Sequence, residues 1–191
     1  MMDDKLELMT NKQYLQAHLS FFALYVSLYE NFVDSIEERV KSFLCVKWTV
    51  DKDDKLVFEE SDTYKTEIRN RRVDEKGNKN ILLASMLWLM DMGAIDQTDY
   101  DTFLSLKQLR NSYAHELADH VWIGVTRDDL ASFDNLFELN TKIDRWWFIN
   151  IDHQITGDVE LTDEELQTVT SSATFILNKM RETLFGKRQD I

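Results

Sequence analysis

The sequence predicts an all-α protein, and three observations lead to this fold class. The 191 residues include no proline and only five glycines, so few residues interrupt a helix. Apolar residues recur at spacings of three and four over most of the chain, which is the repeat of a helix with one buried face. Threonines stand before three of these segments, as N-terminal capping residues do. We therefore expect a bundle of five or six helices with a small β-hairpin insertion.

In the first half of the chain, one long helix precedes shorter elements. Its apolar residues form a broad stripe, which is typical of a helix central to a bundle or at a subunit interface. The patterns that follow predict two strands around a polar tip, a short helix and a polar connection with Gly77 as its hinge. The expected ranges are 11–44 for the long helix, 45–50 and 56–58 for the strands, 63–70 for the short helix and 71–79 for the connection.

Two helices are expected in the middle of the chain. The first covers 80–92 and ends at Gly93, a residue that readily forms a left-handed cap. The second opens at Thr98, where Asp101 three residues later completes the pattern of a capping box. The residues of the second helix expected to face inward are Phe103, Leu106, Leu109, Tyr113 and Leu117.

Two further helices are expected toward the end of the chain. Thr126 before Arg-Asp-Asp opens a helix that reaches about Trp147. Thr162-Asp-Glu-Glu165 is a capping box that opens the last helix, and Gly186 stands just beyond its end. One face of the last helix is expected to carry Leu166, Val169, Ala173, Ile176, Met180 and Leu184.

The composition indicates one domain over 1–191, in which 45–80 is an insertion with the hairpin and a basic loop. A single cysteine, Cys45, excludes an intrachain disulfide, and the start Met-Met-Asp-Asp lacks the positive charge of a signal peptide. The most apolar run, 19–29, is about half the length that spans a bilayer. We expect a cytoplasmic protein without membrane contact.

The formal net charge of −13 bears on nucleic-acid binding. Most non-specific affinity for RNA or DNA comes from Lys and Arg contacts to phosphates, so an acidic chain is repelled at long range. Any RNA binding therefore needs a local basic patch. The one concentration of basic residues is in the polar connection and its flanks: Arg69, Arg71, Arg72, Lys76 and Lys79. These residues are candidates to guide RNA, while the alternative is an exposed loop of mixed charge.

The segment Leu109-Arg-Asn-Ser-Tyr-Ala-His-Glu-Leu117 carries a chemically specific pattern, in which Arg110 and Asn111 are followed by His115. This pattern resembles the signature of the HEPN superfamily, an all-helical fold in which Arg, an adjacent polar residue and His form a metal-independent ribonuclease site. The stretch 81–117, with its Met92-Gly-Ala-Ile95 turn, is also similar to the mannitol operon repressor family, a HEPN-like group. The resemblance implies a HEPN-like helical bundle.

In a catalytic protein of this kind, the chemistry of RNA cleavage gives each residue a role. His115 takes the 2′-hydroxyl proton or protonates the leaving 5′-oxygen, because an imidazole titrates near neutral pH. Arg110 stabilises the charge that develops on the phosphoryl oxygens, and Asn111 orients the phosphate or the imidazole. The expected products are a 2′,3′-cyclic phosphate and a 5′-hydroxyl. The resemblance thus implies an endoribonuclease of a bacterial or phage-related toxin or defence system.

Helix geometry limits how these three side chains can meet. Asn111 and His115 are four residues apart and share a face, whereas Arg110 is about 140° from His115 around an ideal helix. Arg110 joins the others by reaching around the helix, by a local distortion or by facing a second copy. The resemblance implies the last arrangement, a homodimer with two motifs in one cleft.

The alternative function is that of a non-catalytic, mannitol-repressor-like regulator that binds another protein. Arg110 would then pair with Asp99, Asp101 or another carboxylate, while Asn111 and His115 would tie their helix to a neighbour. The acidic charge favours this alternative, and no DNA-reading element is apparent, so direct operator recognition is not expected. Toxins of the superfamily that are controlled by a nucleotidyltransferase antitoxin usually carry Tyr where this chain has Leu117, so control by that type of antitoxin is not implied.

Other patterns predict no cofactor and no metal. His115 and His120 are five apart, whereas a zinc-binding helix places two histidines four apart on one face. Glu116 and His120, at a spacing of four, are expected to form a surface pair. Trp146 and Trp147 are expected in the core or a dimer interface, with base stacking as the alternative.

Overall fold

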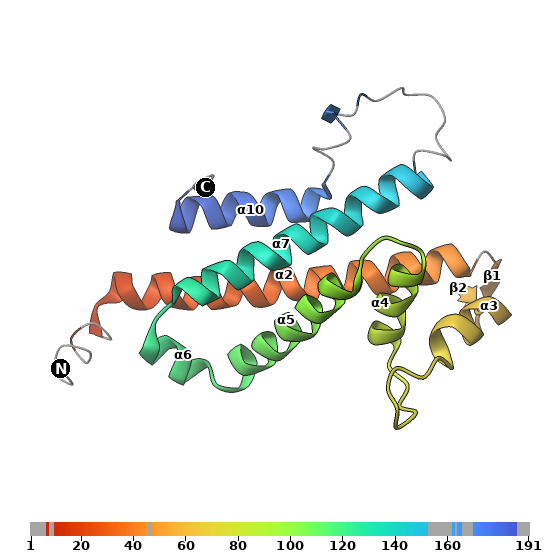
Figure 1. The fold of residues 1–191 in the computed structure, drawn as a ribbon, viewed down its shortest axis with the longest axis horizontal. Coiled ribbons are helices and arrows are strands. Elements are labelled where there is room, and N and C mark those ends of the chain that lie inside the picture. Colours follow the sequence, from red (N-terminus) through yellow and green to blue (C-terminus); the bar gives the residue numbers. More distant parts are fainter. Residues whose placement is uncertain are drawn as a thin grey trace. The chain divides into compact units, whose positions relative to one another are not determined.

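The structure is a computed structural model, and it describes residues 10–45, 47–152 and 170–186 together with the isolated positions 7, 162, 164 and 165. It confirms the all-α class, because the described chain is mostly helical (Figure 1). Its helices are α2 (Lys12–Leu44), α3 (Asp62–Tyr64), α4 (Ile81–Asp91), α5 (Gln97–His115), α6 (Leu117–Ile123), α7 (Arg127–Trp147) and α10 (Ser172–Phe185). The strands are β1 (Lys47–Val50) and β2 (Leu56–Glu59), and the π-helical segments are η1 (Lys65–Arg69) and η2 (Phe148–Asp152).

The chain divides into two compact units, which are described separately. Unit 1 comprises Met1–Glu30 and Asp101–Ile191, and unit 2 comprises Asn31–Tyr100. The segment 45–80 belongs to unit 2, while the single domain expected over 1–191 stays a prediction. In the described part of the chain, no helix combines the length and apolar character needed to cross a membrane.

Unit 2 contains the hairpin that the sequence predicts. Strands β1 and β2 pair in antiparallel fashion, with Val50 opposite Leu56 beside the turn. The Asp51 carboxylate accepts hydrogen bonds from the backbone N–H groups of Asp53 and Lys55, which closes the polar tip. The short helix expected at 63–70 is present as α3 followed directly by η1, whose wider turn is closed by a 2.8 Å bond from Asn70 N to Lys65 O.

Most helix starts agree with the capping signals, and one does not. The side chain of Thr126 caps α7, as its position before the periodic segment predicts. Asn80, predicted as the first residue of its helix, instead caps α4, which begins at Ile81. The capping box expected at Thr98 and Asp101 is wrong. Asp96 and Asp99 instead bond reciprocally, each carboxylate accepting from the other's backbone N–H at 2.9 and 3.0 Å. An Asp–Asp pair can form the same reciprocal box, so α5 begins at Gln97.

Two predicted helices are interrupted. The helix expected to run through Leu117 ends at His115, because Glu116 leaves the helical conformation at φ −123° and ψ 28°. Leu117 therefore begins α6 and is 39% exposed, not inward as predicted.

The last predicted helix is also interrupted. The box between Thr162 and Glu165 forms, but extended Ser171 caps a separate helix, α10. Leu166 and Val169 of the predicted face lie outside the described residues.

The core of unit 1 is a cluster of aromatic rings from α2, α5 and α7. Tyr113 of α5 packs against Phe22 and Tyr25 of α2, with ring centroids 4.8 and 5.0 Å away. Phe133 of α7 lies 5.9 Å from Phe21 and closes the cluster from the third helix. All five rings are at most 1% exposed, so they join the three helices mainly by the burial of apolar surface.

A buried hydrogen bond fixes α5 against α7 inside this cluster. The Tyr113 hydroxyl donates to the Asp129 carboxylate, whose other oxygen accepts 2.8 Å bonds from the backbone N–H and the hydroxyl of Thr126. Burial, and then the bond to Asp129, raise the pKa of Tyr113 well above its usual range, so the phenol remains a donor. The carboxylate that caps α7 therefore also anchors α5.

Polar contacts attach α10 to α7 in an antiparallel arrangement. Ser171 N donates to Asp144 at 2.9 Å, and the buried Asn140 amide donates to the Thr174 hydroxyl. At the other end of the contact, the Arg181 guanidinium pairs with Asp134 at 2.9 Å. Along the pair, residue numbers fall on α7 as they rise on α10, which defines the antiparallel direction.

The Tyr113–Asp129 bond predicts a difference between two buried tyrosines. Tyr113→Phe should lower the free energy of unfolding by about 1.5–3 kcal/mol, because it removes a bond to a charged group and leaves the carboxylate buried. Tyr25→Phe is the matched control, since its hydroxyl makes only a 3.3 Å bond to the Leu106 carbonyl, for which about 0.5–1.5 kcal/mol is expected. Urea denaturation of both variants measures the difference, and equal losses would contradict the assigned role of Asp129.

Candidate functional site

The predicted motif occupies the last two turns of α5. Because Tyr113 is buried, the directions of the other motif side chains around the helix are determined. Tyr113 is 1% exposed, whereas Asn111 and His115 are both exposed. Each of the two lies about 160° from Tyr113 around an ideal helix, so they point away from the core. Arg110 lies between these directions and is half-buried.

Arg110 is held by a carboxylate that the sequence analysis did not identify. Glu30 of α2 accepts from both Nε and Nη2 of Arg110 through the same oxygen, with Nε 2.5 Å away. The third nitrogen, Nη1, donates to the Asn111 side-chain oxygen at 3.2 Å. Arg110 thus contacts Asn111, while no described contact joins it to His115, so how Arg110 meets His115 stays a prediction. A guanidinium carries five N–H donors, so two remain for a ligand.

A sequence signal for Glu30 existed. It is the only Asp, Glu, Lys or Arg between Lys12 and Asp34, and it directly follows the most apolar run, 19–29. A lone charge in such a helix is expected to have a partner. The charges of Glu30 and Arg110 also act on the neighbouring Tyr29. Burial raises the pKa of Tyr29 to about 12, the charge of Glu30 adds to this rise, and the charge of Arg110 partly offsets it.

His115 is the last residue of α5 and is exposed. Its imidazole has no hydrogen-bond partner among the residues that the structure describes. The alternative function expected Arg110 to pair with Asp99, Asp101 or another carboxylate, and Glu30 is such a partner. Its other expectation, that His115 and Asn111 tie α5 to a neighbouring element, is not met by a described contact. The three motif residues together place a guanidinium, an amide and an imidazole on a surface that solvent reaches.

A second polar cluster lies beside the motif, at the corner between α5 and α6. The Ser112 hydroxyl lies 2.8 Å from the Glu116 carboxylate and 2.7 Å from Nε2 of His120. The His120 ring packs edge-on against Tyr113 at 4.7 Å. Glu116 and His120, expected as a direct surface pair, are thus joined through Ser112. The sequence signal for Ser112 is its spacing of four from Glu116, itself four before His120.

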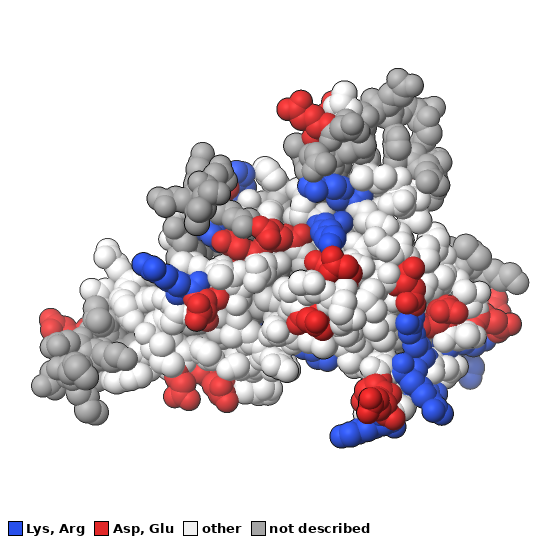
Figure 2. Space-filling view, in the orientation of Figure 1, with Lys and Arg blue, Asp and Glu red and all other residues white. Residues whose placement is uncertain are grey.

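The five predicted RNA-guiding residues belong to unit 2, while the motif belongs to unit 1. Two of the five are engaged in ion pairs, Arg69 with Glu60 and Arg71 with Asp91. Lys79 donates to the Asn70 side chain at 2.9 Å, and Arg72 and Lys76 are exposed. Figure 2 shows acidic and basic side chains interspersed over one face of the molecule. The guiding role stays a prediction.

Two other candidates are placed by the structure. Trp147 is 3% exposed and Trp146 is half-buried against it, with centroids 5.3 Å apart, which agrees with core packing for Trp147. Among the described residues, no group of three His, Cys, Asp or Glu is arranged to hold a metal ion.

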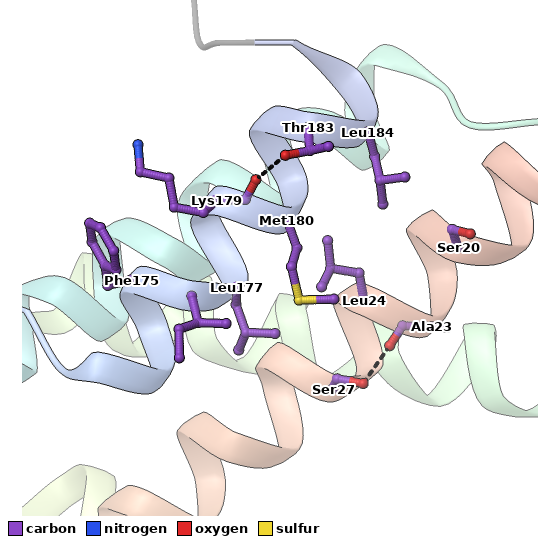
Figure 3. A pocket seen from close by; sticks show the side chains of 11 residues that line it. Ser20, Ala23, Leu24, Ser27, Phe175, Leu177, Lys179, Met180, Thr183 and Leu184 are labelled. Carbon is purple, nitrogen blue, oxygen red and sulfur yellow. Dashed lines mark hydrogen bonds between the residues drawn. The ribbon is translucent and has the colours of Figure 1, made fainter.

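An open apolar groove of about 700 Å³ lies between α2 and α10, on residues that the motif does not include. In Figure 3, Met180 points from α10 toward Leu24 on α2. We call this the α2/α10 groove, and its lining residues are Ser20, Ala23, Leu24, Ser27, Phe175, Ile176, Leu177, Lys179, Met180, Thr183 and Leu184. The predicted apolar face of the last helix is therefore only partly covered: Ile176 is 57%, Met180 49% and Leu184 44% exposed.

His18 holds the loop between α6 and α7 against α2. Its Nδ1 accepts a 2.9 Å hydrogen bond from the backbone N–H of Val125, and its ring packs against Tyr14 at 4.0 Å. Gly124 has φ +87°, and a Cβ there would lie 2.6 Å from the Tyr14 hydroxyl, so glycine is required at this close approach. Burial lowers the pKa of His18 below its usual 6.5.

The lowered pKa of His18 predicts a pH-dependent stability. The folded state favours the neutral ring, so its contribution is present above pH 6.5 and is lost as the pH falls through the lower folded pKa. Urea unfolding at a series of pH values from 8 to 5 should show this decline, and His18→Asn, which keeps an acceptor near Nδ1 but does not titrate, should reduce it. An unchanged pH dependence in His18→Asn would contradict the assignment.

In comparisons with protein-family models, with curated proteins and with solved structures, no match to this chain was found.

Proposed function

We propose that this chain is a HEPN-type, metal-independent endoribonuclease whose site is formed by Arg110, Asn111 and His115. One observation carries the proposal: Glu30 holds the Arg110 guanidinium beside Asn111, while His115 stays exposed on the same end of α5. Charge, amide and proton-transfer groups are thus available together on one helix. The resemblance of 81–117 to HEPN proteins supports the same chemistry.

The geometry supports a distinct role for each group. The two N–H donors of Arg110 left by Glu30 and Asn111 bind phosphoryl oxygens as negative charge develops on them. Asn111 accepts from Arg110 through its oxygen, which leaves its NH₂ group to donate to a ligand. His115 transfers a proton to or from the reacting oxygens, and cleavage leaves a 2′,3′-cyclic phosphate and a 5′-hydroxyl.

Glu30 has two opposing effects on such a site. It fixes the guanidinium before RNA arrives, which lowers the cost of ordering it, but its charge opposes the approach of a phosphate. With the chain at −13, RNA binding needs basic residues, and the proposed RNA-binding residues are those of unit 2, among which no described carboxylate pairs with Arg72, Lys76 or Lys79. The proposed setting is a cytoplasmic toxin or defence system, with a homodimer and a protein antitoxin as proposed partners.

Cleavage of RNA by the purified protein in EDTA tests the proposal. We expect wild type to produce 2′,3′-cyclic phosphate and 5′-hydroxyl ends, and His115→Ala and Arg110→Ala to lower the rate by about 10²–10⁴-fold. Induced expression should halt growth for wild type and not for these two variants. Arg127→Ala is the matched control, since it removes an exposed cation of unit 1 that is on α7 and not on the motif helix.

Two outcomes oppose the proposal. Equal cleavage by wild type and by His115→Ala would identify a contaminating nuclease, and intact RNA in every reaction would exclude the activity on the substrates used. Normal folding of each variant is checked by its circular dichroism and melting temperature.

The second candidate function is a non-catalytic, mannitol-repressor-like regulator that binds another protein. The α2/α10 groove favours it, because the large apolar side chains along α10 are about half exposed and could accept an apolar partner surface. Intact RNA, together with a stoichiometric partner whose binding is lost in Ile176→Asp and kept in His115→Ala, would support this function over the first.

A further inference from the structure

Metal-independent cleavage of RNA needs two proton transfers, and the motif contains one imidazole. One group must remove the proton from the attacking 2′-hydroxyl, and another must protonate the leaving 5′-oxygen. A second imidazole lies at the α5–α6 corner, where Nε2 of His120 is 2.7 Å from the Ser112 hydroxyl oxygen. This distance makes His120 a candidate for the second group.

The hydrogen-bond directions around Ser112 determine where the protons of His120 lie. An ionised Glu116 carboxylate can only accept, so the Ser112 hydroxyl donates to it at 2.8 Å. The Ser112 oxygen must then accept from His120, which places a proton on Nε2. In the neutral ring this leaves Nδ1 as a free base. Among the described residues Nδ1 has no partner, and His120 is partly exposed.

Two aromatic rings hold the His120 imidazole in this orientation. Tyr113 packs against it at 4.7 Å and Phe22 at 5.7 Å, and both rings belong to the buried core of unit 1. The imidazole therefore rests on the buried aromatic core of the unit. A proton-transfer group supported in this way keeps its direction without help from a ligand.

The cluster adjoins the motif on α5. Residues three apart on a helix have Cβ atoms about 5–6 Å apart, so His115 neighbours Ser112 on the surface. The two imidazoles thus flank Ser112, one as its neighbour along α5 and one through a hydrogen bond. Asn111 and Arg110 continue the same strip of polar side chains on the other side of His115.

We propose that His120 is the general base and His115 the general acid of the ribonuclease reaction, an inference that rests on the function proposed above. Nδ1 of His120 takes the 2′-hydroxyl proton as the 2′-oxygen forms its bond to phosphorus. The bond from phosphorus to the 5′-oxygen breaks, and the His115 imidazolium gives its proton to that oxygen. Glu116, acting through Ser112, stabilises the imidazolium formed on His120, as a carboxylate does in hydrolase triads. One chain then carries both proton-transfer groups.

The competing explanation is structural, because the same bonds fasten α6 to the end of α5. A measurement of kcat/KM against pH separates the two. Wild type should give a bell-shaped profile on the RNA that it cleaves. His120→Gln should lower the rate by about 10²–10⁴-fold and lose the acidic limb, and His115→Gln should lose the alkaline limb. Asp119→Asn, an exposed change on α6, should keep both limbs.

Two further readings complete the test. Ser112→Ala keeps the imidazole and removes the relay, so we expect a lower kcat with an unchanged KM even if His120→Gln does not fold. If His115→Gln is inactive while His120→Gln and Ser112→Ala keep the wild-type rate and both limbs, the inference is overturned and the proposed function stands. If wild type cleaves no RNA, both are overturned.

Discussion

The burial of Tyr113 is the constraint on which the arrangement of unit 1 depends. Its ring fills the space between α2 and α7, and its hydroxyl is bound by Asp129, the residue that also caps α7. Because the ring faces inward, the rotation of α5 about its axis is fixed, and Asn111 and His115 face outward. The packing of the Tyr113 ring and the hydrogen bond from its hydroxyl to Asp129 therefore determine which side chains of the motif are exposed to solvent.

The sequence was sufficient for the parts of the fold that depend on local signals. The long helix, the hairpin, the cap at Thr126 and the location of the motif follow from periodicity and turn chemistry. The break at Glu116 was missed because apolar periodicity continues through Leu117, which turns outward. The partner of Arg110 was missed for a different reason: Glu30 is 80 residues away, and only the packing of α5 on α2 brings the two together.

Charge distribution connects the candidate site with the rest of the chain. An acidic protein that binds RNA has to compensate locally for a repulsive total charge, and Glu30 adds to that repulsion beside Arg110. The same carboxylate orders the guanidinium. The same logic applies at Ser112, where Glu116 places a further negative charge beside an imidazole. The carboxylates around α5 therefore orient hydrogen-bond donors, and they do so at the expense of a high positive electrostatic potential.

The attachment of α10 has a consequence for local unfolding. Its hydrogen bond and ion pair with α7 join Asn140 to Thr174 and Asp134 to Arg181, while much of its apolar face remains uncovered. Cooperative opening of a helix costs less when little apolar surface must be exposed. Amide protons of α10 should accordingly exchange with solvent earlier than those of α2, α5 and α7, which makes α10 a folding unit of lower stability than the aromatic core.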